Sequence, residues 1–180
     1  MADRLHLIRE RAEDPRTRTD RATLIEARAF LPATREQIEA AEVSLDFSLP
    51  AFLCRVYTAI GNGGFGPGRG LIGVPGGATD EHGNSIVDLY DSYAASNPDD
   101  DAWRWPDRLV PFCHWGESVY SCADCSDSEV AVVCFDLTEY EPGIDLRDLM
   151  VTQHTSVERW LEAWAEGIDL WQEMFQLDLG

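Results

Sequence analysis

The residues with the clearest potential for chemistry are the five cysteines. Cys122 and Cys125 have the Cys-x-x-Cys spacing that is typical of a zinc knuckle or a redox pair. A structural zinc site needs a second ligand pair, but Cys113 and Cys134 each lie nine residues from the nearer of these two, up to about 30 Å along an extended strand. We therefore expect reduced, metal-free thiols buried on strands. A zinc site and a redox pair are the alternatives.

The motifs of the common hydrolases are missing from the sequence. It contains no Gly-x-Ser-x-Gly elbow and no His-Glu-x-x-His pair, and its four histidines are scattered through different predicted elements. Cys113 and His114 are adjacent, but neighbours on a strand point to opposite faces. We predict no catalytic residue. A metal-binding or hydrolytic enzyme built on Cys113, His114, Cys122 and Cys125 is the enzymatic alternative.

All fourteen basic residues are arginine, and the chain has no lysine. A Walker-A phosphate loop and a pyridoxal-phosphate Schiff base both need the lysine amine, as does any lysine base or nucleophile. The composition excludes these classes, and we predict no cofactor.

One glycine-rich segment, Gly61-Asn62-Gly63-Gly64-Phe65-Gly66, formally fits the Gly-x-Gly-x-x-Gly pattern of dinucleotide-binding turns. Such a turn follows a strand and opens a helix, whereas this segment follows a predicted helix. We interpret it as a helix C-cap in which Gly61 or Asn62 adopts the left-handed conformation and the next glycines permit close packing.

The formal net charge is −19, and most of the acids lie after residue 35. Such a surface repels nucleic acid and attracts basic proteins at rates that depend on ionic strength. We expect a basic protein partner and no nucleic acid. The alternative is that the acids serve only solubility.

A loop that combines acids with large aromatic residues is the predicted partner-binding site. Asp99, Asp100 and Asp101 precede Trp103 and Trp105. Tryptophan is a frequent desolvated anchor in interfaces, and aspartate complements arginine or lysine. In the alternative interpretation, both tryptophans line the core while the acids cap a helix or face water.

The elements that would position these residues begin with helices. Residues 1–30 predict one or two amphipathic helices, with Leu5, Ile8 and Ala12 on one face. Further helices are predicted after the capping-box pair Thr34 and Gln37, after Pro50, over residues 84–95, and from Thr155 onward with a break at Gly167.

Apolar runs predict strands at residues 71–74, 109–112, 118–122 and 130–135, and the last two should form an antiparallel hairpin. Helices at both ends packed around a mostly antiparallel sheet define a single α+β domain. No apolar run is long enough to span a membrane, and the N-terminus lacks the features of a signal peptide. We expect no membrane partner and a cytoplasmic location.

The core of this pattern resembles the SMI1/KNR4 (SUKH) family, whose hallmark is Leu-Pro, a hydrophobic helix, and then Asn-Gly-Gly. The residues that carry the likeness are Leu49, Pro50, Tyr57, Asn62, Gly63 and Gly64. Residues 111–116 and 120–125 resemble a strand pair of one bacterial branch. The likeness begins near residue 32, so residues 1–31 are expected to form a helical arm outside a SUKH-like domain of residues 32–180.

The resemblance implies a binding module without catalytic residues. In bacteria such domains are used largely as immunity proteins against polymorphic or contact-dependent toxins, and in fungi they act in cell-wall signalling. It therefore implies that this chain binds a toxin domain stoichiometrically. A regulatory interaction scaffold is the alternative.

Overall fold

The computed structural model describes residues 4–13 and 30–177. The expected second N-terminal helix falls within residues 14–29, outside the described residues. In chain order the described helices and strands are α1 (Arg4–Glu13), α2 (Arg35–Leu45), α3 (Ala51–Ala59), α4 (Ile86–Ala94), β1 (Leu109–Gly116), β2 (Val119–Asp124), β3 (Val132–Asp136), the short 3-10 helices η2 (Leu137–Glu139) and η3 (Leu146–Leu149), β4 (Met150–His154), α5 (Val157–Glu166) and α6 (Leu170–Leu177).

The four strands form one antiparallel sheet in the order β1-β2-β3-β4. The hairpin of β2 and β3 pairs Tyr120 with Phe135 and Cys122 with Val133, which confirms the predicted hairpin. Strand β4 was not predicted, and it adds to the outer edge of β3. The expected α+β single domain is confirmed.

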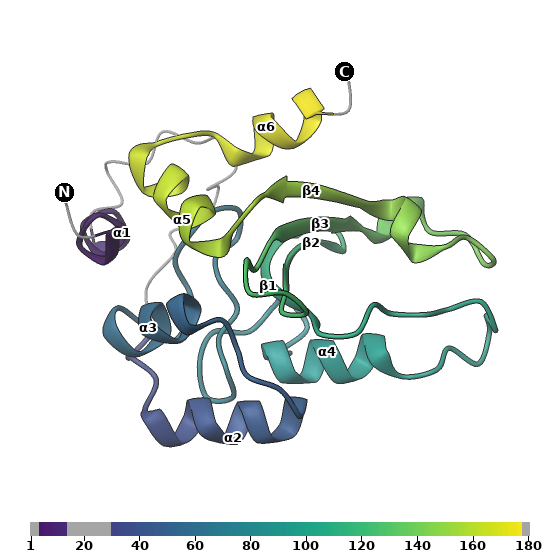
Figure 1. The fold of residues 1–180 in the computed structure, drawn as a ribbon, viewed down its shortest axis with the longest axis horizontal. Helices are drawn as coiled ribbons and strands as arrows, with labels where there is room; N and C mark the ends of the chain where they lie inside the picture. Colours follow the sequence, from purple (N-terminus) through teal and green to yellow (C-terminus); the bar gives the residue numbers. More distant parts are fainter. Residues whose placement is uncertain (1–3, 14–29, 178–180) are drawn as a thin grey trace.

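Helices cover both faces of the sheet (Figure 1). On one face, Tyr93 of α4 meets Tyr120 and Phe135 edge-on, with ring centroids 6.0 and 6.1 Å apart. On the other, Phe112 of β1 packs against Trp160 of α5 at 5.2 Å. Because successive strand residues point to opposite faces, the sheet contributes buried side chains on both of its faces, and these belong to one hydrophobic core.

Local chemistry sets the starts of the helices. Thr34 caps α2 with the predicted capping box: its hydroxyl oxygen accepts from the Gln37 amide, and the Gln37 side-chain oxygen accepts from the Thr34 amide. Ser85 and Asp88 form the same arrangement at the start of α4. At α5 the predicted cap was wrong: Ser156, not Thr155, accepts from the backbone of Arg159. Gly167 ends α5 in the left-handed conformation, as its break signal predicted.

The glycine-rich segment after α3 is a set of turns, and the predicted strand at residues 71–74 is reduced to one bridge between Leu71 and Cys113. Within residues 61–66 the positions with positive φ are Gly63, Gly64 and Gly66, so the predicted left-handed cap at Gly61 or Asn62 was wrong. Asn62 instead uses its buried side chain: its Oδ1 accepts from the Val74 amide at 2.9 Å, and its Nδ2 donates to the Val74 carbonyl.

Candidate partner-binding surface

The acidic loop that joins α4 to β1 is anchored from within by one of its own acids. Asp100 is only 8% exposed. It accepts hydrogen bonds from the Tyr140 hydroxyl at 2.6 Å, from the Gly143 amide at 2.9 Å and from the Ala102 amide at 2.8 Å. The Tyr140 bond is the main reason why the pKa of Asp100 is lowered. Asp100 therefore ties its loop to the loop between β3 and β4.

The two tryptophans of the predicted site lie under this loop. Trp103 and Trp105 are 9% and 8% exposed, and their indole N–H groups donate to the carbonyls of Tyr93 and Leu109 at 2.7 and 2.8 Å. Trp105 stacks on Tyr93 with ring centroids 4.7 Å apart. Both rings are thus buried, as the alternative interpretation of the sequence predicted, and they pack beneath the exposed part of the loop.

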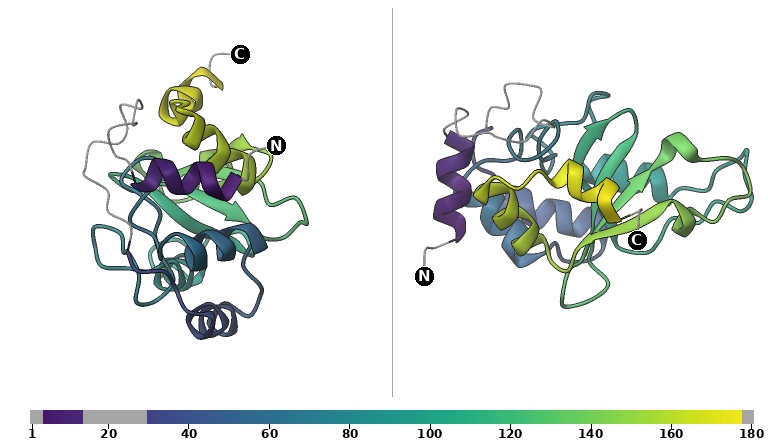
Figure 2. Two further views of the ribbon diagram at one scale, coloured as in Figure 1. Left: turned by 90° about the vertical axis from the view of Figure 1, so that its left-hand side faces the viewer. Right: turned by 90° about the horizontal axis from the view of Figure 1, so that it is seen from above.

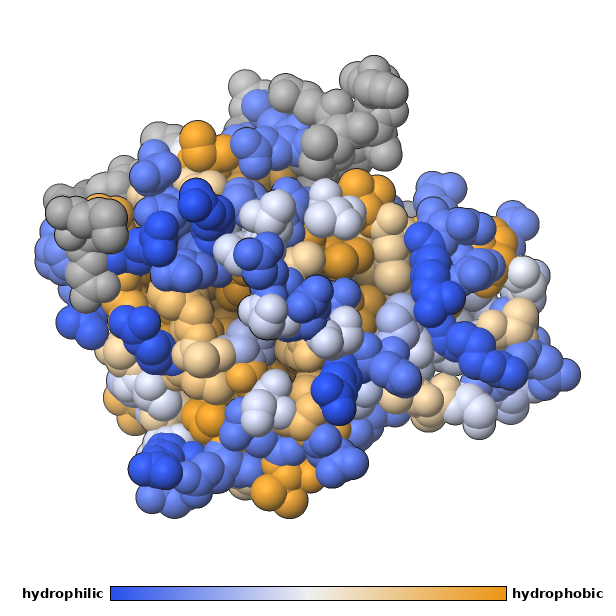
Figure 3. All heavy atoms as spheres, in the orientation of Figure 1, coloured by the Kyte–Doolittle hydropathy of each residue, from blue (hydrophilic) through white to orange (hydrophobic). Residues whose placement is uncertain are grey.

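The neighbouring acids remain at the surface. Asp99 and Asp101 are exposed, and so are Glu139 and Glu141 on the loop that Asp100 holds. We call these four residues the acidic end. The two loops extend together from one end of the molecule (Figure 1), where the surface is mostly hydrophilic (Figure 3). The sequence predicted the first loop as a binding site, which stays a prediction, and it gave no signal for the second loop, because only folding brings Tyr140 next to Asp100.

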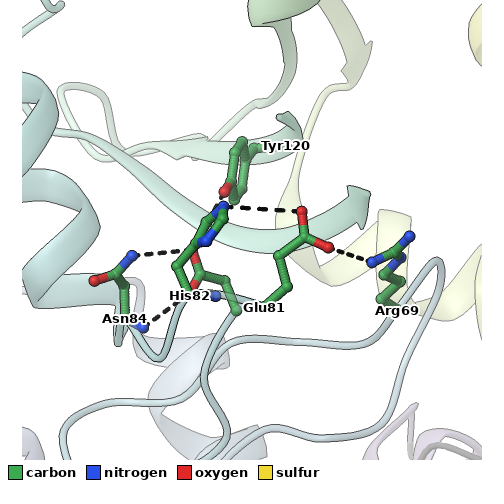
Figure 4. A network of polar contacts seen from close by, with 6 residues as sticks. Arg69, Glu81, His82, Asn84 and Tyr120 are labelled. Carbon is green, nitrogen blue, oxygen red and sulfur yellow. Dashed lines mark hydrogen bonds and ion pairs between the residues drawn. The ribbon is translucent and has the colours of Figure 1, made fainter. Parts of the chain in front are cut away.

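A second polar cluster lies where the loop before α4 meets the sheet (Figure 4). The buried Asp80 accepts from the amides of His82 and Asn84 at 2.9 and 2.8 Å, and from the Tyr120 hydroxyl at 3.3 Å. These hydrogen bonds lower the pKa of Asp80 despite its desolvation, which is the largest single influence and acts in the opposite direction. At the surface, Arg69 pairs with Glu81.

The pKa values of the two ionisable rings near Asp80 are shifted so that both rings stay neutral. Burial raises the pKa of Tyr120 to about 12 and lowers the pKa of His114, whose ring stacks on Tyr120 at 6.4 Å. At neutral pH this predicts a neutral phenol and a neutral imidazole beside an ionised carboxylate. The arrangement fixes the loop on strand β2, and the exposed Arg69–Glu81 pair is the part of the cluster that a partner can reach.

The cysteines lie in or near the core. Cys113 and Cys122 are buried and the other three are half-buried; none of the five forms a disulfide. Burial raises the pKa of Cys54 to about 11 and that of Cys125 to about 12, so both thiols are protonated at neutral pH. Within residues 4–13 and 30–177, no group of three His, Cys, Asp or Glu side chains is arranged to hold a metal ion. The absence of metal stays a prediction.

The hallmark residues form one packed unit. Leu49 and Pro50 are buried at the start of α3, where Pro50 is the N-cap. Tyr57, fully buried, donates from its hydroxyl to the Ile72 carbonyl at 2.5 Å. The Gly64 amide donates to the Leu71 carbonyl at 2.8 Å. The hallmark thus joins α3 to the turns that follow it.

The described helices and strands form a single α+β domain with one antiparallel sheet. The family model described as SMI1 / KNR4 family (SUKH-1) matches residues 32–163, and the chain belongs to this family. A search of curated proteins found no relative that matches the chain. Across the described part of the chain, no helix combines the length and the apolar character needed to cross a membrane. The family is generally non-catalytic, with immunity or regulatory roles.

Proposed function

We propose that this chain is a non-enzymatic immunity protein that neutralises a bacterial toxin by binding a basic toxin domain stoichiometrically. Membership of the SUKH family supports this function, because such domains are commonly immunity proteins. The observation that carries the choice of a basic partner is the acidic end, whose four exposed carboxylates stand on a chain of net charge −19.

The acidic end is suited to electrostatic capture. Asp100 and the two buried tryptophans hold the two loops in one arrangement before any partner binds. Little conformational entropy is therefore lost on binding. Exposed carboxylates steer a basic surface toward them and raise the association rate. In this proposal Asp99 and Asp101 contact the partner, while Asp100, Trp103 and Trp105 contribute by keeping the loops in place.

The test first identifies a toxin domain encoded in the neighbourhood of this gene and then uses that purified domain as the binding partner. Surface-plasmon kinetics should show an association rate that falls as salt rises past about 0.15 M, where the Debye length is about 8 Å. The Asp99→Asn, Asp101→Asn double variant should lower the association rate at low salt and leave the dissociation rate almost unchanged. Glu36→Gln with Glu39→Gln, two exposed acids on α2, is the matched control and should have little effect.

Salt-independent binding that tolerates the Asp99 and Asp101 substitutions would place the interface elsewhere and leave the acids as a solubility feature. A gene neighbourhood without a toxin, together with capture of a housekeeping partner, would favour the regulatory scaffold instead.

A further inference from the structure

Helix α1 lies outside the family match, yet it is docked on the family domain. It runs across one end of the molecule (Figure 2, left), and its contacts are made mainly with α5. Its buried residues are Ile8, Arg11 and Ala12, and Ile8 has no exposed surface. With Arg4 they follow the i, i+4, i+7, i+8 spacing of a single helical face.

Arginines on this face of α1 contact acidic and aromatic side chains of α5. Arg4 lies 2.8 Å from Glu158 and 2.9 Å from Glu162, which are one turn apart on α5. The Arg11 guanidinium lies over the Trp164 ring, 5.1 Å from its centroid. Beside them, Arg9 donates to the Ala59 carbonyl at the C-terminal end of α3. We call Glu158, Glu162 and Trp164, with this end of α3, the α5 seat.

The α5 seat borders a cavity at Glu158. Glu158 also lines an open cavity of about 370 Å³ between the starts of α3 and α5. Pro50 and Phe52 contribute apolar walls to this cavity, and Glu129 contributes a second carboxylate. Arg159 lines the cavity as well, so its lining is mixed in charge, and the α5 seat shares only Glu158 with it.

We infer that the α5 seat is a docking site for a basic amphipathic helix, occupied in this structure by the chain's own α1, and that a helix of the same chemistry from another protein exchanges with α1 there. Helix-in-groove recognition uses such an i, i+4, i+7 set of anchors. Occupation in cis lowers the apparent affinity for an incoming helix by the fraction of molecules in which the seat is open. This goes beyond the proposed function, because it concerns a surface separate from the acidic end.

The test measures binding of a fluorescent peptide of residues 1–13 to the full chain. The Ile8→Asp chain places a charge in the buried contact and should release α1, so it should bind the peptide about tenfold or more tightly than the wild-type chain does. The same peptide carrying Ile8→Asp is the matched control and should not bind. Adding Glu158→Arg and Glu162→Arg to the Ile8→Asp chain should weaken its binding of the wild-type peptide. The same triple variant should regain binding of a peptide that carries Arg4→Glu.

A full chain carrying Arg4→Glu guards against misfolding, because Arg4 is partly exposed and its loss leaves the buried contact intact. It should keep a wild-type near-ultraviolet circular dichroism spectrum and bind the wild-type peptide more tightly than the wild-type chain does. Cooperative unfolding of the Ile8→Asp chain, with no peptide binding by either variant, would make α1 an integral part of the core and overturn the inference. Elution of the wild-type chain as a dimer through exchanged α1 helices would overturn occupation in cis.

Discussion

Replacement of Gly63 by alanine is the most direct probe of the turns that follow α3. Gly63 has φ +78, and a Cβ built there would lie 2.6 Å from the Leu71 carbonyl oxygen and 2.8 Å from the Gly73 amide nitrogen. Both neighbours are backbone atoms, and both segments are held by hydrogen bonds: the Leu71 carbonyl accepts from Gly64, and the Gly73 amide donates to Ala78. The new methyl group therefore cannot be accommodated by the rotation of a side chain.

The expected destabilisation has two parts. A residue with a Cβ in the left-handed region costs about 1–2 kcal/mol relative to glycine. Forcing an extra carbon into a packed site costs about 1–3 kcal/mol more. Gly63→Ala should therefore lower the free energy of unfolding by about 2–5 kcal/mol. For a chain of this size that corresponds to a melting temperature lower by roughly 5–15 °C.

Gly83→Ala is the matched control, because Gly83 has φ +87 but nothing within 4 Å of the position of its Cβ. It carries the conformational cost without the overlap. Urea unfolding followed by tryptophan fluorescence would give both free energies, and Gly63→Ala should be the more destabilised by about 1–3 kcal/mol. Equal losses for the two variants would refute the packing argument. An unchanged stability with lost partner binding would make the turn a ligand site.

Three further predictions concern ionisable groups and thiols. Burial lowers the folded pKa of His114 below its ordinary value of 6.5, so the unfolded chain takes up the proton first and stability falls as pH drops below about 6.5, at no more than about 1.4 kcal/mol per pH unit. Urea unfolding at pH 7.5 and 5.5 should show a smaller fall for His114→Gln. Asp100→Asn and Tyr140→Phe should each lower the free energy of unfolding. The loss in the double variant should be smaller than the sum of the two single losses, because both substitutions remove the same hydrogen bond. Strictly additive losses would contradict that bond. Elemental analysis should find the protein free of zinc, and about one zinc per chain would mean that Cys122 and Cys125 are ligands.

Several features governed by neighbouring residues were predictable from the sequence, although the caps predicted at Thr155 and at Gly61 or Asn62 were wrong. The capping box of Thr34 and Gln37 and the break of the C-terminal helix at Gly167 depend on short-range bonds, and both are confirmed. The apolar face of α1 was also predicted, and Ile8 and Ala12 are buried on it. The division of the chain at residue 31 stays a prediction.

Features that depend on distant partners were missed. Strand β4 has weak apolar alternation and exists through its pairing with β3. Residues 71–74 were predicted as a strand, but the side chains of Asn62 and Tyr57 bond to the backbone of this segment, and only Leu71 forms a strand bridge. In the sequence Asp100 resembles its two acidic neighbours, and its hydrogen bonds from Tyr140 and Gly143, some forty residues away, distinguish it. Its burial is a tertiary effect that no local pattern encodes.

The burial of Asp100 has a consequence for how this protein can change over time. Anchoring and exposure are divided between adjacent positions: Asp100 secures the two loops, while Asp99, Asp101 and Glu139 face solvent. Exposed positions tolerate most replacements at a cost within about 0.5 kcal/mol. The surface charge of the acidic end can therefore change at little cost to the fold, while Asp100 keeps the arrangement of the two loops. Under the proposed function, selection or a laboratory library could alter the choice of partner through these exposed positions alone.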